Sequence, residues 1–216
     1  MTGRLLRRRE AIFALGAGLG AIWSVSRRGA SASAAGTCVL SPEQIEGPFY
    51  VAGEPFRSDI TEGRPGTSLR LKLRVRDAMT CRRIKGATVD IWHTDAAGDY
   101  SGVNGATSTF MRGQQTTDGI GRTVFTTIYP GWYPGRTTHI HVKVHVGGTV
   151  VHTGQLYFPD TITDAVYAVE PYAAHGLRST TNAADILYAS GGAESTLTLR
   201  RRRGVYTARS ILVVQT

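Results

Sequence analysis

The sequence of 216 residues predicts an all-β fold, an antiparallel β-sandwich with long functional loops and little helix. Three observations support this prediction. Apolar and polar residues alternate over several short segments, as expected for strands with one buried face. Glycine- and proline-rich turns separate these segments, which is typical of a two-sheet sandwich. Only residues 160–172 and 182–190 have even a short helical pattern.

The first three expected strands are residues 69–76, 87–92 and 122–128. In the first of them, leucines and a valine alternate with four basic residues, so we expect one buried face and one solvated basic face. Residues 98–118, between the second and third strands, are expected to form a long loop. Loops held on a rigid scaffold commonly carry binding residues.

A tight hairpin is expected around Gly147 and Gly148, between strands at residues 138–146 and 149–158. A second long loop, residues 130–137, precedes this hairpin. Sheets built from such strands would pack as in an immunoglobulin-like sandwich. The remaining expected elements are the two short helical stretches and the closing strands 195–201 and 205–214.

Residues 1–34 have the composition of an export signal. An arginine-rich start precedes an apolar stretch and then small residues around an Ala-Ser-Ala site. The adjacent arginines favour a signal of the twin-arginine type, with an ordinary secretory signal as the alternative. The apolar stretch is short for a membrane span. We therefore expect residues 35–216 to form one exported domain without a stable membrane span.

Most of the basic charge belongs to this signal. The formal net charge of the chain is +9, and residues 1–34 contain six arginines and one glutamate, which leaves +4 for residues 35–216. A mildly basic domain does not indicate a nucleic-acid partner, and none is expected. The run from Arg200 to Arg203 is interpreted as a solvated strand end, with contact to an anionic polymer as the alternative.

The two cysteines, Cys38 and Cys81, both follow the signal. In an oxidising compartment, two such cysteines most simply form a disulfide, while two free buried thiols are the alternative. The bond would close a loop of 43 residues. Loop-closure entropy gives such a bond a stabilising effect of about 4 kcal/mol at most.

Residues 127–144 hold the most informative motif, TIYPGWYPGRTTHIHVKV. His139 and His141 are two residues apart on an expected strand, so both project from the same face and could chelate a metal. The phenol of Tyr133 adds a hard oxygen donor, and this mixture of donors suits ferric iron. The alternative is a solvated strand face, which Lys143 and His145 would continue.

Several motifs in matching order make the chain resemble the intradiol ring-cleaving catechol dioxygenases, in particular their small secreted branch. The resemblance runs from about residue 40 to the C-terminus. It implies a ferric iron held by Tyr100, Tyr133, His139 and His141, of which Tyr100 is identified through the resemblance alone. The motifs are EGPFY (46–50), GATVDIWHTDAAGDYSG (86–102), TDG (117–119), TIYPGWYPGRTTHIH (127–141) and GQL (154–156).

The resemblance also implies the reaction and three catalytic roles. Both atoms of O₂ would enter a catechol-type aromatic diol, and the ring would open between the two hydroxylated carbons to give a muconate-type diacid. Tyr133 would leave the iron and accept a substrate proton, Arg136 would stabilise negative charge on the ring, and Gln155 would point towards the iron-bound oxygens. Without the resemblance, Arg136 is a surface arginine in a turn and Gln155 an ordinary strand residue.

Two further hypotheses remain open from the sequence. The first is a non-catalytic secreted β-sandwich that binds a ligand, of a transthyretin-like, carbohydrate-binding or aromatic-binding kind. The second is a copper or zinc protein that uses the histidines and leaves the tyrosines unexplained. The larger catechol-specific members of the family dimerise through a long N-terminal helical segment. Only a short arm precedes residue 69 here, so that dimer and the oligomeric state stay open.

Overall fold

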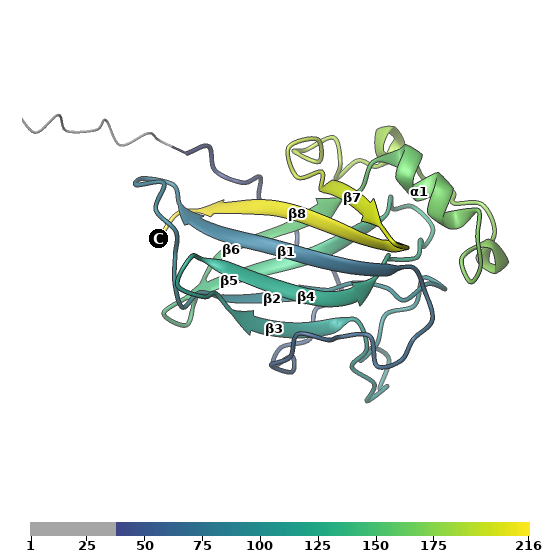
Figure 1. Cartoon of the computed structure of the whole chain (residues 1–216), viewed down its shortest axis with the longest axis horizontal. Helices are drawn as coiled ribbons and strands as arrows, with labels where there is room; N and C mark the ends of the chain where they lie inside the picture. Colours follow the sequence, from purple (N-terminus) through teal and green to yellow (C-terminus); the bar gives the residue numbers. More distant parts are fainter. Residues whose placement is uncertain (1–37) are drawn as a thin grey trace, which may run out of the picture. The chain divides into compact units, whose positions relative to one another are not determined.

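The structure, a computed structural model, describes residues 38–216. The predicted export signal, residues 1–34, lies outside the described residues. Two four-stranded sheets, β4-β1-β8-β7 and β3-β2-β5-β6, are stacked face to face (Figure 1). The strands are β1 (Ser68–Asp77), β2 (Thr88–Trp92), β3 (Arg112–Thr116), β4 (Arg122–Ile128), β5 (His139–Val146), β6 (Thr149–Tyr157), β7 (Thr198–Arg202) and β8 (Val205–Val214).

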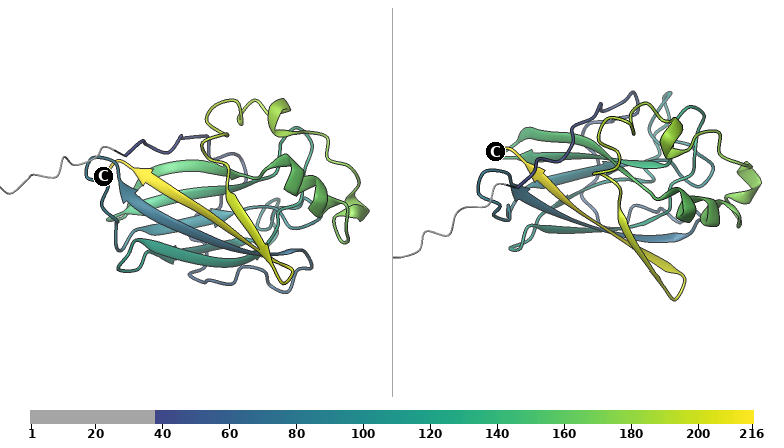
Figure 2. Two further views of the ribbon diagram at one scale, coloured as in Figure 1. Left: turned by 45° about the horizontal axis from the view of Figure 1, so that its top comes forward. Right: turned by 90° about the horizontal axis from the view of Figure 1, so that it is seen from above.

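The prediction of an all-β sandwich with little helix is confirmed for the described residues. The helical elements there are α1 (Asp160–Tyr167) and two single 3₁₀ turns, Ala173–His175 and Asn182–Ala184. They lie at the end of the sandwich away from the C-terminus (Figure 2). Within residues 38–216, no helix is both long and apolar enough to cross a membrane.

Three details of the predicted fold are wrong. The expected loop at 98–118 contains strand β3. This edge strand pairs with β2 through its backbone, and its polar sequence RGQQT has no apolar alternation by which it could be predicted. The pairing of β1 with β8 is parallel, so the sandwich is not purely antiparallel. The segment 182–190 is mostly turn, since the carboxylate of Asp185 accepts hydrogen bonds from the N–H groups of Leu187 and Tyr188.

The core lies between the two sheets. In β1, Leu69, Leu71, Leu73 and Val75 are at most 1% exposed and alternate with basic residues that point outward, as predicted. Strand β5 contributes the side chains of Ile140, Val142 and Val144 to the same core. Burial of this apolar surface is the main stabilising contribution to such a fold.

The histidine-bearing face of β5 is also buried. His139 and His141 are only 3% and 2% exposed. An N-terminal arm, residues 38–58, lies against this part of the fold, and Gln44 N donates to Thr153 O of the neighbouring strand β6 at 3.0 Å. The two histidines are therefore not part of a solvated strand face, which was the alternative interpretation of the motif.

A disulfide joins the start of this arm to the loop after β1. Cys38 and Cys81 are bonded, with their Cα atoms 5.4 Å apart. Two backbone hydrogen bonds fix the arm nearby, from Cys38 N to Ala78 O and from Ser41 N to Val213 O. The predicted pairing is thus present, and it tethers the arm to the sheet that contains β1 and β8.

His93 makes the fold sensitive to acid. The side chain is fully buried, with Nδ1 2.7 Å from Thr94 O and Nε2 2.8 Å from Thr127 Oγ1. Burial, reinforced by the charge of Arg112, lowers the pKa of His93 from 6.5 to about 4. Below pH 6.5 this histidine binds a proton in the unfolded chain, whereas in the folded chain it stays neutral down to about pH 4. The free energy of unfolding therefore falls as the pH is lowered through this window.

We therefore expect this histidine to remove about 2 kcal/mol from the free energy of unfolding between pH 7 and pH 5. Urea denaturation of the wild type and of His93→Gln at both values measures the effect, since glutamine can keep both hydrogen bonds without titrating. The variant should lose less stability on acidification than the wild type. His175→Gln, at an exposed position, is the matched control. Equal acid sensitivity in His93→Gln and the wild type would contradict the prediction.

Candidate metal centre

The four predicted ligand residues come together in space. Around Nε2 of His139 lie Nε2 of His141 at 3.1 Å, Oη of Tyr133 at 3.3 Å and Oη of Tyr100 at 3.5 Å. The donors come from three segments: the loop between β2 and β3, the loop between β4 and β5, and the start of β5. Two phenol oxygens and two imidazole nitrogens thus converge on one point.

Glycines allow the two tyrosine-bearing loops to meet. A side chain on Gly131 would place its Cβ 2.5 Å from Asp95 O, and one on Gly98 would overlap the carbonyl of Trp132. Without these side chains, Gly131 N donates to Asp95 O at 2.8 Å, and the loops pack backbone against backbone. This close approach brings Tyr100 beside Tyr133, with ring centroids 5.8 Å apart.

The orientation of the histidines suits metal binding. Nδ1 of His139 lies 2.6 Å from Thr137 O and donates its proton there, which leaves a lone pair on Nε2. The ring of His141 stacks on Trp92, with centroids 4.9 Å apart and planes within 4°. Its buried Nδ1 has no hydrogen-bond partner among the described residues. A cation bound between the two Nε2 atoms would satisfy both lone pairs, so this donor set fits a metal.

Without a bound metal, burial keeps the two phenols and the two imidazoles neutral. It raises the pKa of Tyr100 well above 10, with Tyr133 adding to the effect. Burial likewise raises the pKa of Tyr133, although Arg136 opposes it. Burial lowers the pKa of His139 to about 3 and that of His141 well below its usual value. Neutral imidazoles are ready ligands, whereas the phenols need a strongly charged cation to become phenolates.

A metal site that combines the two histidines with the two tyrosines has four candidate donors. Across residues 38–216, no three His, Cys, Asp or Glu side chains cluster in a way that could hold a metal ion. Zinc sites are usually built from such groups. A copper or zinc site that relies on the histidines and ignores the tyrosines is therefore disfavoured.

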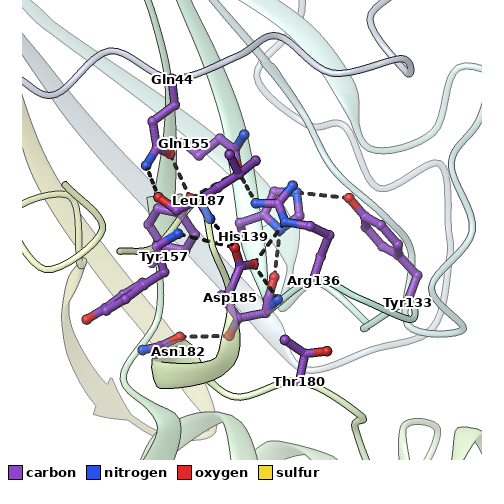
Figure 3. A network of polar contacts seen from close by, with 12 residues as sticks. Gln44, Tyr133, Arg136, His139, Gln155, Tyr157, Thr180, Asn182, Asp185 and Leu187 are labelled. Carbon is purple, nitrogen blue, oxygen red and sulfur yellow. Dashed lines mark hydrogen bonds and ion pairs between the residues drawn. The ribbon is translucent and has the colours of Figure 1, made fainter. Parts of the chain in front are cut away.

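Arg136 and Gln155 lie side by side next to the four donors. Arg136 Nη2 donates to Gln155 Oε1 at 2.5 Å (Figure 3). Gln155 Nε2 donates to Ile45 O of the arm at 3.1 Å. The pairing of β5 with β6 sets Gln155 opposite His141. The sequence-based expectation that Gln155 points towards metal-bound oxygens stays a prediction.

Three more residues at the site were not identified as functional from the sequence. Phe49 stacks on Tyr100 with centroids 4.4 Å apart, and the fully buried Trp92 packs against the ring of His141. Asp185 forms an ion pair with Arg136. Phe49 does lie in the EGPFY motif, but nothing in the local pattern around Asp185 indicates its contact with Arg136.

One surface hollow is lined by none of the four donors. It has a volume of about 680 Å³ and lies on the outward face of β1, β4 and β8. Its charged lining residues are Lys72, Arg74, Arg122, Arg209 and Glu194. Because this hollow lacks histidine and tyrosine donors, its size gives no reason to place the metal chemistry there.

Comparison with known proteins places the chain among dioxygenases. A family model described as "Dioxygenase" matches residues 45–182. Among solved structures, the intradiol ring-cleavage dioxygenase from Tetranychus urticae is 34% identical in sequence and superposes with a TM-score of 0.80. That match covers 82% of this chain and 95% of the Tetranychus urticae protein.

Two curated bacterial proteins match over shorter regions. A catechol 1,2-dioxygenase of Pseudomonas sp. (strain EST1001) is 41% identical over 66 residues, which cover 28% of this chain and 22% of the relative. A chlorocatechol 1,2-dioxygenase of Pseudomonas sp. (strain P51) is 26% identical over 138 residues, which cover 53% of this chain and 54% of the relative. The matches thus span about half or less of the length of these curated relatives.

Proposed function

This chain belongs to the family of intradiol ring-cleavage dioxygenases, and we propose that it is a non-haem Fe(III) enzyme acting on a catechol-type aromatic diol. The reaction inserts both atoms of O₂ and opens the ring between the two hydroxylated carbons to a muconate-type diacid. The observation that supports this proposal most is the convergence of Tyr100, Tyr133 and His141 on Nε2 of His139.

The proposed iron would be held by these four side chains. When bound, ferric iron supplies a Lewis acid that binds the diol and draws electron density from its ring. The two phenolates would offset part of its charge and favour the ferric state, and the two neutral imidazoles would complete the donor set. Tyr100 and Tyr133 are partly exposed whereas the histidines are buried, so the diol approaches from the side of the tyrosines.

The chain's own groups would handle protons and charge. Tyr133 accepts one proton of the diol at its phenolate oxygen. Arg136, which is charged at every relevant pH, stabilises negative charge on the substrate ring. The amide of Gln155, already hydrogen-bonded to Arg136, offers a polar contact beside it.

We place the enzyme outside the cytoplasm. Two features support export: the arginine-rich, apolar and small-residue order of residues 1–34, and the Cys38–Cys81 disulfide, which persists in an oxidising compartment. Its substrate would then be an aromatic diol available outside the cytoplasm.

Oxygen uptake with a panel of diols, followed by mass spectrometry of the product formed under ¹⁸O₂, tests the reaction. We expect uptake of one O₂ per diol and a diacid that contains both labelled atoms. Iron-free protein is the control and should consume no oxygen. Tight diol binding by iron-loaded protein without oxygen uptake would contradict the proposal and favour the non-catalytic binding module.

A further inference from the structure

Asp185 is a fully buried carboxylate with a complete set of hydrogen bonds. Its side chain has 0% exposure. One oxygen, Oδ2, accepts from Arg136 Nε at 2.9 Å and from Thr137 N at 2.8 Å. The other, Oδ1, accepts from the backbone N–H groups of Leu187 at 2.7 Å and Tyr188 at 3.2 Å. A buried charge with this many donors is strongly oriented.

The segment around Asp185 is fixed independently of Arg136. Gln44 Nε2 of the N-terminal arm donates to Leu187 O at 2.6 Å and to Ser190 O at 2.9 Å. On the other side, Thr137 Oγ1 donates to Asn182 Oδ1 at 2.7 Å. Asp185 therefore has a defined position before any contact with the guanidinium, and it acts as the anchor in the pair.

Arg136 is correspondingly held at two points. Asp185 accepts from Nε and Gln155 accepts from Nη2, so the plane of the guanidinium is defined (Figure 3). The arginine itself is 16% exposed, on the side where the tyrosines are also partly exposed. An arginine side chain has about 2 kcal/mol of rotamer entropy, which a two-point anchor of this kind removes before substrate arrives.

We propose that Asp185 is a positioning residue that fixes the guanidinium of Arg136 beside the ligand tyrosines. It does so without touching the substrate or the metal, and the inference rests on the proposed function of the site. The family model matches residues 45–182 and therefore stops short of Asp185. A displacement of a charged group by about 1 Å can lower a rate by about 10²-fold, so the anchor has a kinetic consequence.

Asp185→Asn is the direct test, because asparagine keeps the shape but removes the charge that pairs with Arg136. Its one acceptor oxygen can serve Leu187 N and Tyr188 N, while its NH₂ group cannot accept from Arg136 Nε or Thr137 N. We expect kcat for the best diol to fall by about 10²-fold. The dissociation constant for anaerobic catechol should change less than about threefold. Iron content should match the wild type, because none of the four ligands is altered. Asp164→Asn is the matched control, because it removes an exposed carboxylate of α1 from its ion pair with another arginine, Arg178.

A double-variant cycle separates positioning from a general loss of structure. In an Arg136→Gln background, Asp185→Asn should have almost no further effect on kcat, because the group that it positions is gone. Equal fold-losses in both backgrounds would overturn the inference while leaving the dioxygenase function intact. Unchanged kcat in Asp185→Asn would overturn it as well.

A crystal structure of Asp185→Asn tests the same point without activity. The guanidinium of Arg136 should leave Gln155 or occupy more than one conformation, while Tyr133 and His139 keep their positions. An unmoved guanidinium would overturn the inference even if the wild type proved inactive on every diol. An inactive wild type would count against the proposed function. The position of the Arg136 guanidinium in the Asp185→Asn crystal structure would still test the role of Asp185.

Discussion

His139→Ala is expected to remove both bound iron and ring cleavage. Nε2 of His139 is the atom on which the other three donors converge, so its loss leaves no complete site. Tyr133→Phe tests the second kind of ligand, because it deletes one oxygen and keeps the ring that packs edge-on against Phe49. We expect each variant to lose at least about 10³-fold in kcat/KM. Elemental analysis and oxygen uptake measure the two effects.

Tyr129→Phe is the matched control for the tyrosine variant. The hydroxyl of Tyr129 shares one hydrogen bond with Thr163 Oγ1 at 2.8 Å, and the residue lies in the hydrophobic core and is not one of the four donors. It should keep its iron and its turnover. Full activity in His139→Ala or Tyr133→Phe would show that the ligand assignment is wrong.

Removal of the disulfide is expected to have the largest effect on stability. Replacing Cys38 and Cys81 together with serine frees a loop of 43 residues in the unfolded chain. The free energy of unfolding should fall by about 4 kcal/mol. Denaturation in guanidinium chloride measures it, and a reductant should destabilise the wild type but not the double variant. An unchanged free energy of unfolding would contradict the prediction.

The same bond has a consequence for the site, because it tethers the arm that covers the histidines. Gly47 of the arm passes so close to His141 that an added Cβ would lie 3.3 Å from the imidazole, and Phe49 stacks on Tyr100. We expect the double serine variant to bind iron and turn over at low temperature. Its activity should be lost on heating earlier than that of the wild type.

Local patterns in the sequence predicted most of the strands and pointed to three of the four candidate ligands, Tyr133, His139 and His141. The alternation in β1 and β5 is a local signal, and two histidines spaced by one residue must share a face of their strand. Tyr100 has no such signal, because it lies in a loop whose path is set by contacts with the loop of Tyr133. It was identified only through the order of motifs shared with a known family.

Other features depend on contacts between distant segments. The face of His139 and His141 is buried because residues 38–58 lie across it, and no pattern within β5 indicates that cover. The parallel pairing of β1 with β8 and the ion pair of Arg136 with Asp185 arise in the same way. In each case a sequence pattern describes a single segment, whereas the contact depends on a second segment that is distant in the sequence.

The visible absorption spectrum of the purified, iron-loaded protein tests the central claim most directly, recorded before and after anaerobic addition of catechol. Two tyrosinates on ferric iron should give a broad charge-transfer band, and this band should move to longer wavelength when the diol binds. A colourless protein that stays colourless after ferric reconstitution would contradict the assignment of Tyr100, Tyr133, His139 and His141 as an iron site.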